Sequence, residues 1–174
     1  ASLGNKGKDK NLSPYAFTKS KNLEMLENLK RWFKMKYEVI YFYNVYGKGQ
    51  IEKGPTATVI GIFEDCYKKK KPLPIVMPGT QSRRFTHIED TVKICYLAWK
   101  NNDYKHYSIS NKKSYTIAQV AKLFKSKIKF LPPRKGERYA SALTNISQSN
   151  KVHKYFGKLQ LESYVKDLLE KYNK

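Results

Sequence analysis

The sequence of 174 residues is poor in cysteine and histidine. Its two cysteines, Cys66 and Cys95, each fall on an apolar helical face, so we expect two buried free thiols, with a disulfide or a metal pair as the weaker alternative. Free thiols fit a reducing compartment. The three histidines, His87, His106 and His153, are isolated and lack the spacing of metal ligands. The sequence therefore predicts no metal site.

Long apolar segments and targeting signals are also missing. No run of apolar residues is long enough to cross a bilayer, and there is no signal-peptide pattern. These absences predict a soluble protein of the cytoplasm with no membrane partner. A chain of this length has room for one domain with a real core, or for parts of two.

Acidic residues are few. Asp and Glu number 14 against 35 Lys and Arg, 30 of them lysine, and the net charge is +21. A nucleic-acid-binding protein is the first class that such a charge suggests. However, the lysines are spread along the chain, their one run is Lys68 to Lys71, and no nucleic-acid motif accompanies them. A compositional bias of the source explains the charge better, so a basic nucleic-acid-binding protein is kept as an alternative.

The glycines do not form the turn that holds a dinucleotide. Gly47, Gly49 and Gly54 have the wrong spacing, because the third glycine should follow three residues after the second, and no helix pattern opens at Gly54. No other set among the nine glycines fits. The sequence thus offers no element of its own for the pyrophosphate of a dinucleotide.

A tyrosine and a lysine stand at the start of a strong helix pattern. Ser13 is a good N-cap, Pro14 suits the first helical position, and apolar residues recur at helical spacing up to about Met35. On this helix Tyr15 and Lys19 lie one turn apart on the same face. An ammonium close to a phenol favours the phenolate. The pair is therefore a candidate base, and an ordinary exposed pair is the alternative.

Two further side chains are candidates for binding. Residues 37–43 are β-branched and aromatic and predict a parallel strand buried on both faces. Asn44 closes this strand, where α/β sheets place their ligands, and its amide suits a sugar or a base edge; capping of the turn is the alternative. Arg83 lies in a polar turn over 79–85, and its guanidinium can bind a diphosphate bidentately unless it is a surface arginine.

The rest of the chain alternates between helix and strand patterns, which indicates an α/β fold. The expected helices cover 56–70, 90–100 and 161–172, with another capped by Ser114, and the expected strands cover 73–76, 106–109 and 128–131. Two prolines end the last strand before Arg134, a second candidate phosphate ligand.

Four runs occur in the order and at about the separations of one known family. They are SPYAFTK over 13–19, YNVYGKGQ over 43–50, GTQSRRFTHIED over 79–90 and PRKGER over 133–138. The chain resembles the extended short-chain dehydrogenase/reductases, the NAD-dependent sugar-nucleotide epimerases and dehydratases, of which UDP-glucose 4-epimerase is the best-known member. The resemblance covers nearly the whole chain, which looks like only the second half of the family's length.

The resemblance implies the later half of a Rossmann-like parallel sheet plus the smaller C-terminal substrate-binding domain. Residues 1–50 would belong to the NAD-binding domain, whose first half is absent. Residues 51–174 would form the substrate-binding region, with 85–111 crossing back to the Rossmann sheet. The catalytic Ser or Thr of the family would fall before Ala1, since Ser2 is not in its register.

The activity implied is a reversible oxidation, with NAD as cofactor and a nucleotide-diphosphate sugar as substrate. Tyr15 would be the catalytic base and Lys19 its electrostatic partner, and both would contact the cofactor. Asn44, Arg83 and Arg134 would hold the nucleotide sugar. A non-catalytic remnant that binds sugar nucleotides is the alternative to an epimerase or dehydratase.

The implied partners are a chain that supplies the missing NAD-binding half and a second copy that docks through the helix of Tyr15 and Lys19. A half sheet should also expose an edge and an apolar face, which predicts self-association. Three positions depart from the family: Tyr41 stands where it more often has Arg, Arg84 where it usually has Asp, and Asn145 where it tends to have Asp.

Overall fold

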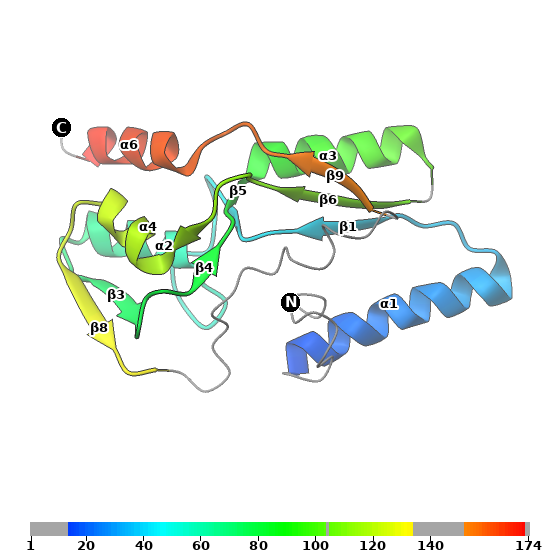
Figure 1. The fold of residues 1–174 in the computed structure, drawn as a ribbon, viewed down its shortest axis with the longest axis horizontal. Helices are drawn as coiled ribbons and strands as arrows, with labels where there is room; N and C mark the ends of the chain where they lie inside the picture. The colour runs from blue at the N-terminus through cyan, green and yellow to red at the C-terminus, as the bar shows by residue number, and fades with distance from the viewer. Residues whose placement is uncertain (1–13, 104, 134–151, 173–174) are drawn as a thin grey trace.

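The computed structural model describes residues 14–103, 105–133 and 152–172 (Figure 1). Helices and strands alternate within these ranges, and the predicted α/β class is confirmed. The helices are α1 (Pro14–Phe33), α2 (Val59–Lys68), α3 (Ile88–Asn101), α4 (Ile117–Leu123) and α6 (Leu161–Tyr172). The strands are β1 (Val39–Phe42), β2 (Val45–Tyr46), β3 (Leu73–Val76), β4 (Ser82–Arg83), β5 (Thr86–His87), β6 (His106–Ser110), β7 (Tyr115–Thr116), β8 (Ile128–Leu131) and β9 (Val152–Phe156).

A parallel sheet of three strands, in the order β1, β6, β9, forms one part of the fold. Helix α3 packs on one face of this sheet through Ile94 and Ala98, which contact Tyr107 and Ile109 of β6. Ile94 and Ala98 are four residues apart and so fall on one side of the helix. Because β1 and β6 are parallel neighbours, their carboxyl ends lie at the same edge of the sheet, which is where parallel sheets bind ligands.

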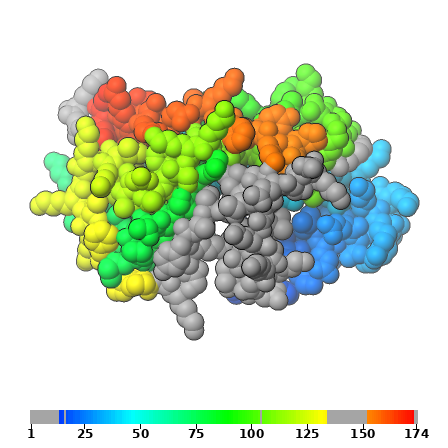
Figure 2. Space-filling model, viewed as in Figure 1, coloured from blue at the N-terminus to red at the C-terminus, as the bar shows by residue number. Residues whose placement is uncertain are grey.

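Helix α1 lies on the other side of the three strands from α3 and runs antiparallel to β1 (Figure 1). In the space-filling view it lies at the opposite end of the molecule from α4 and β8 (Figure 2). None of its described side chains is fully buried: Leu23, Leu26 and Leu29 are half-buried, and Trp32 and Phe33 are 57% and 73% exposed. α1 therefore presents apolar surface that the described chain does not cover. Because helices are held mainly by packing, we expect this surface to pack against another element.

The prediction that the strand before Asn44 is buried on both faces is wrong. Val39, Ile40 and Tyr41 are only half-buried, and Phe42 is 53% exposed. Within the described residues β1 has one neighbour in the sheet, β6, and α1 does not seal its outer face. The sequence is that of a central strand, whereas the chain places it at an edge.

A second core lies between α2, α4, α6 and the parallel pair β3 and β8. At its centre the ring of Phe63 on α2 meets that of Phe124, just after α4, edge-on at a centroid distance of 5.7 Å. Leu73 of β3 and Val165 of α6 are also buried there. Two short ladders, β2 with β5 and β4 with β7, complete the described strand pairings.

Three local predictions need correction. The N-cap of α4 is Thr116 instead of Ser114: the Thr116 hydroxyl accepts from the Gln119 backbone N–H at 3.1 Å, and the Gln119 side chain accepts in return at 2.8 Å. Ser114 precedes β7, and its hydroxyl pairs with that of Ser82. Arg83, for which a turn was predicted, lies in strand β4, and β2, β5, β7 and β9 likewise have no counterpart among the predicted elements. Finally, the free thiols Cys66 and Cys95 are half-buried instead of fully buried, and this burial raises the pKa of both.

Candidate functional site at the carboxyl ends of β1 and β6

Asn44 lies two residues after the end of β1 and has a left-handed backbone, with φ of +39°. Asparagine tolerates this conformation better than most residues. Its side-chain Nδ2 donates to the backbone oxygen of Arg84 at 3.0 Å, and its own backbone oxygen accepts from Thr86 N–H at 3.3 Å. Asn44 is exposed. The structure thus holds an accessible amide at the edge of the sheet where a ligand is expected.

Arg84 links the end of β1 to the end of β6. Its Nη1 donates to the backbone oxygen of Asn111 at 3.1 Å, and Asn111 follows β6. Asn111 is only 3% exposed, and its own amide donates to the oxygen of Leu159 at 3.2 Å while accepting from Lys113 N–H at 3.0 Å. The sequence reasoning missed Asn111, although an amide just after a strand is the signal that identified Asn44.

Arg83 occupies β4 and pairs with Tyr115 of β7. Its side chain is half-buried, and Nη1 donates to the backbone oxygen of Ser82 at 2.8 Å. Because Arg83 adjoins Arg84 in the chain and Arg84 holds Asn44, two of the three predicted substrate ligands lie in one region. The third, Arg134, lies outside the described residues.

A buried phenol adjoins this region. Tyr43 is 3% exposed, and within the described residues its hydroxyl has no hydrogen-bond partner. Burial raises the pKa of Tyr43 to about 12, and the positive charge of Arg84 acts in the opposite direction. The Tyr43 phenol is therefore uncharged at neutral pH, and it lies close enough to Arg84 to be influenced by the positive charge of the guanidinium.

Tyr15 and Lys19 lie on the same face of α1, as the spacing predicts. Nζ of Lys19 is 5.6 Å from the centre of the Tyr15 ring, so the ammonium contacts the ring face. Tyr15 is 61% exposed. Since α1 runs antiparallel to β1, its first turn lies toward the carboxyl end of β1 (Figure 1). Among the described contacts, none joins this pair directly to Asn44 or Arg83.

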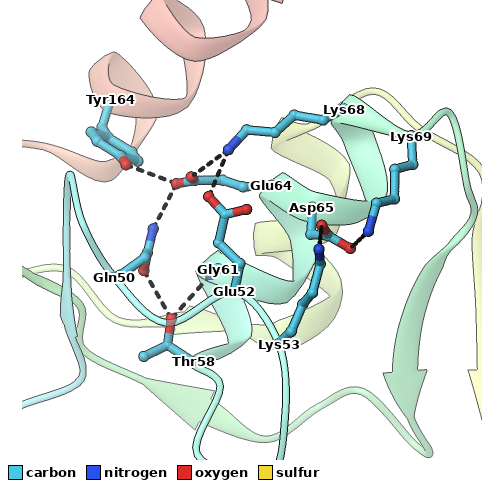
Figure 3. Close-up of polar contacts among 10 residues, drawn as sticks. All are labelled: Gln50, Glu52, Lys53, Thr58, Gly61, Glu64, Asp65, Lys68, Lys69 and Tyr164. Atoms are coloured by element: carbon cyan, nitrogen blue, oxygen red, sulfur yellow. Dashed lines mark hydrogen bonds and ion pairs between the residues drawn. The ribbon is translucent and has the colours of Figure 1, made fainter.

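A polar network holds the segment that follows Asn44 (Figure 3). The carboxylate of Glu64 on α2 is 5% exposed and accepts from Tyr164 of α6 at 2.7 Å and from the Gln50 amide at 2.6 Å. The Gln50 oxygen in turn accepts from the Thr58 hydroxyl at 2.8 Å. Burial raises the pKa of Glu64, and the hydrogen bond from Tyr164 and the charge of Lys68 partly oppose the shift.

Further ion pairs surround this carboxylate. Nζ of Lys68 lies 2.6 Å from the Glu52 carboxylate and 3.9 Å from that of Glu64 (Figure 3). Lys53 and Lys69 both pair with Asp65, at 3.6 and 2.7 Å. The network ties residues 50–58 to α2 and α6, and thereby fixes the loop that leaves the candidate site.

Two site classes find no support in the described part of the chain. No group of three or more His, Cys, Asp or Glu side chains comes together there in a way that could hold a metal ion. Every helix of the described ranges is too short or too polar to cross a bilayer.

Comparison with known proteins identifies relatives. A model of the "NAD dependent epimerase/dehydratase family" matches residues 4–110. A protein of Methanocaldococcus jannaschii, named "Putative UDP-glucose 4-epimerase", is 32% identical over 136 residues, which are 74% of this chain and 43% of that protein. The chain therefore spans less than half of this relative.

Solved structures share the fold. The UDP-glucose 4-epimerase of Thermotoga maritima, solved with UDP-glucose, superposes with a TM-score of 0.75 at 26% identity, over 92% of this chain and 53% of that one. The UDP-glucuronic acid 4-epimerase of Bacillus cereus, solved with UDP-glucuronic acid and NAD, gives a TM-score of 0.70 at 19% identity, over 93% and 53%. The latter likeness is one of fold alone. On the family match and the shared fold, the chain belongs to the NAD-dependent epimerase/dehydratase family of extended short-chain dehydrogenase/reductases.

Proposed function

We propose that this chain is the substrate-binding and proton-transferring portion of an NAD-dependent epimerase or dehydratase that acts on a nucleotide-diphosphate sugar, in the manner of UDP-glucose 4-epimerase. The observation that carries the proposal is the contact between Asn44 and Arg84, which brings an exposed amide and the guanidinium of Arg84 to the carboxyl ends of β1 and β6. Relatives of the same fold were solved with UDP-sugars.

The nucleotide sugar is held by polar side chains of this chain. Arg83 binds the diphosphate, because a guanidinium matches two phosphate oxygens at once. Arg134 binds the same group by resemblance. Asn44 contacts the sugar, since its amide offers both a donor and an acceptor. Holding the sugar in one orientation supplies much of the rate enhancement of such reactions.

Tyr15 and Lys19 carry the proton. The phenolate of Tyr15 accepts the proton of a sugar hydroxyl and becomes a neutral phenol, and the ammonium of Lys19 stabilises the phenolate before this step. Closure of the site around the exposed α1 strengthens the interaction, because charges attract more strongly away from water. The chemistry that bound NAD would supply is the acceptance and return of a hydride at the sugar carbon.

The residues present fit one end of NAD. Tyr15 and Lys19 are exposed on one face of α1 and would contact the nicotinamide ribose. The turns at Gly47, Gly49 and Gly54 do not open a helix at a strand end, so they do not suit its pyrophosphate. A further NAD-binding half, in the same or another chain, would supply that element together with the catalytic Ser or Thr.

The open edge of β1 and the uncovered surface of α1 support a division of the NAD-binding domain into two halves, of which this chain holds the second. Residues 1–50 then form the second half of the NAD-binding domain, and 51–174 the substrate-binding region, with 85–111 crossing back to the sheet through β6. The missing half would pair with β1, and a second copy would dock on α1 to form a homodimer. We place the assembly in the cytoplasm.

Equilibrium binding tests the proposal. We expect UDP-glucose to bind the chain saturably and NAD⁺ to bind it far more weakly. Asn44→Ala and Arg83→Met should each weaken UDP-glucose binding about tenfold, and Lys93→Met on α3 should leave it unchanged. Tight binding of NAD⁺ would show that the account of the missing half is wrong. Turnover after addition of that half separates an enzyme from a non-catalytic remnant.

A cluster of lysines favours one alternative, a basic protein that binds nucleic acid. The connection from α2 to β3 lies beside that from α4 to β8. The two are joined by a hydrogen bond in which the Leu73 N–H donates to the Lys127 oxygen at 2.8 Å. Six exposed lysines gather there: Lys69, Lys70, Lys71, Lys122, Lys125 and Lys127. Only Lys69 among them has a carboxylate partner in the described chain. Duplex binding that falls steeply with salt, without any affinity for sugar nucleotides, would favour this alternative.

A further inference from the structure

Arg84 is a fixed cation that lacks a counter-charge in the described chain. One guanidinium nitrogen donates to the Asn111 oxygen at 3.1 Å, and the Arg84 backbone oxygen accepts from Asn44 at 3.0 Å. The side chain is half-buried, and no described carboxylate forms an ion pair with it. Asn111 is itself held by Leu159 and Lys113, so the contact that positions the guanidinium is rigid.

Such a group is suited to an anion. A guanidinium has five N–H donors in a planar fork, and one neutral carbonyl satisfies a single donor. Removing part of its hydration without supplying a negative charge is unfavourable, and a carboxylate that binds the fork bidentately corrects this. Arg84 is therefore better explained by a bound anion than by its contacts within the described chain.

The position of Arg84 indicates which anion. Arg83, its neighbour in the chain, is already the candidate ligand of the diphosphate. Asn44, the candidate ligand of the sugar, rests on the Arg84 backbone. Arg84 is therefore a further cation next to the candidate ligand of the sugar, and the diphosphate does not require it. A carboxylate on the sugar would supply the missing negative charge.

We propose that Arg84, together with Asn44, binds the carboxylate of an acidic sugar, and that the substrate class of this chain is a nucleotide-diphosphate hexuronate. This inference rests on the proposed function of the site and narrows it. No covalent step is added: the guanidinium orients the carboxylate and discriminates against neutral hexoses, whose hydroxymethyl group leaves the cation uncompensated.

Calorimetric titration with UDP, UDP-glucose and UDP-glucuronate at about 0.15 M salt tests the inference, since exposed charges are largely screened there. We expect UDP-glucuronate to bind about tenfold tighter than UDP-glucose, as one charge-assisted hydrogen-bonded pair would provide. Arg84→Met should abolish this ratio and leave UDP unaffected. Arg31→Met removes the same charge from the exposed surface of α1 and should preserve the ratio, which controls for the general attraction of anions to a basic protein.

The outcomes separate this inference from the proposed function. Equal affinity of the wild-type chain for the two UDP-sugars overturns the inference alone. Equal weakening of all three ligands by Arg84→Met also overturns it, because Arg84 would then bind the diphosphate or support the fold. Absence of UDP binding overturns both. If Arg84→Met fails to fold, Arg84→Lys serves instead: it keeps the charge but loses the fork, so the ratio should fall to an intermediate value.

Discussion

The phenol of Tyr41 on β1 and the imidazole of His106 on β6 share a hydrogen bond of 2.9 Å between Tyr41 Oη and His106 Nδ1. Tyr107 and Ile109 of β6 face α3, and side chains alternate along a strand, so His106 and its partner Tyr41 face the opposite side of the sheet. Burial lowers the pKa of His106 below its usual 6.5, and the charge of Glu27 on α1 opposes this shift. An ionisable contact thus lies across two strands of the parallel sheet.

The first prediction concerns pH. The unfolded chain binds a proton at His106 near pH 6.5, whereas the folded chain binds it only at lower pH, so the contribution of His106 to stability is lost as the pH falls below 6.5. Urea unfolding at pH 7.5 and at pH 5 should show a smaller loss of stability in His106→Gln than in the wild type. An identical loss in both would contradict the prediction.

The second prediction concerns Glu64. Glu64→Ala leaves the Tyr164 hydroxyl and the Gln50 amide without an acceptor in a buried site, and should lower the free energy of unfolding by about 2–3 kcal/mol. Asp65→Ala on the same helix removes a more exposed carboxylate and should cost less than about 1 kcal/mol. Denaturant titration of the two variants measures the difference, and similar losses would argue against the buried network.

The pH dependence at Glu64 has the opposite sign to that at His106. Its pKa is raised in the folded state, so the folded chain binds the proton first as the pH falls. This carboxyl therefore contributes relatively more stability below its folded pKa than at neutral pH. Glu64→Gln, which carries no charge, should remove that rise when unfolding is compared between neutral and mildly acidic pH.

The third prediction concerns the turn after Asn44. Gly47 has φ of +145°, and a Cβ built on it would lie 2.5 Å from Cγ2 of Ile88, the first residue of α3, so Gly47→Ala requires Ile88 or the turn to move. We expect a loss of about 2 kcal/mol or more. Gly49 has φ of +84° with open space around it, and Gly49→Ala should cost only the backbone strain, about 1 kcal/mol. Thermal unfolding compares the two, and equal losses would show that the close approach to Ile88 does not matter.

The fourth prediction concerns self-association. The apolar surface of α1 and the edge of β1 should cause the lone chain to associate or to be poorly soluble. Trp32→Ser with Phe33→Ser should reduce the associated fraction, while Trp99→Ser on α3, where the side chain is 72% exposed, should not. Light scattering at several concentrations measures the association. A wild-type chain that stays monomeric throughout would contradict the prediction.

The sequence by itself determined the local elements and the family. Periodicity placed the helix of Tyr15 and Lys19, whose predicted N-cap Ser13 lies outside the described residues, and the strands over 73–76 and 128–131 lie where the pattern predicts them. These features are local, since a helix or strand pattern is read from residues a few positions apart. The order of four short runs then sufficed to indicate the epimerase/dehydratase family.

Only the tertiary structure decided which distant side chains meet. Asn44 contacts Arg84 across 40 positions of the chain, and Glu64 contacts Tyr164 across 100. The tertiary structure also decided which residues are buried. The apolar residues 39–42 predict a central strand, yet β1 is an edge strand because the described chain supplies it with one neighbour. The physical reason is that hydrogen-bond partners and solvent exposure depend on what packs against a residue, which local periodicity does not encode.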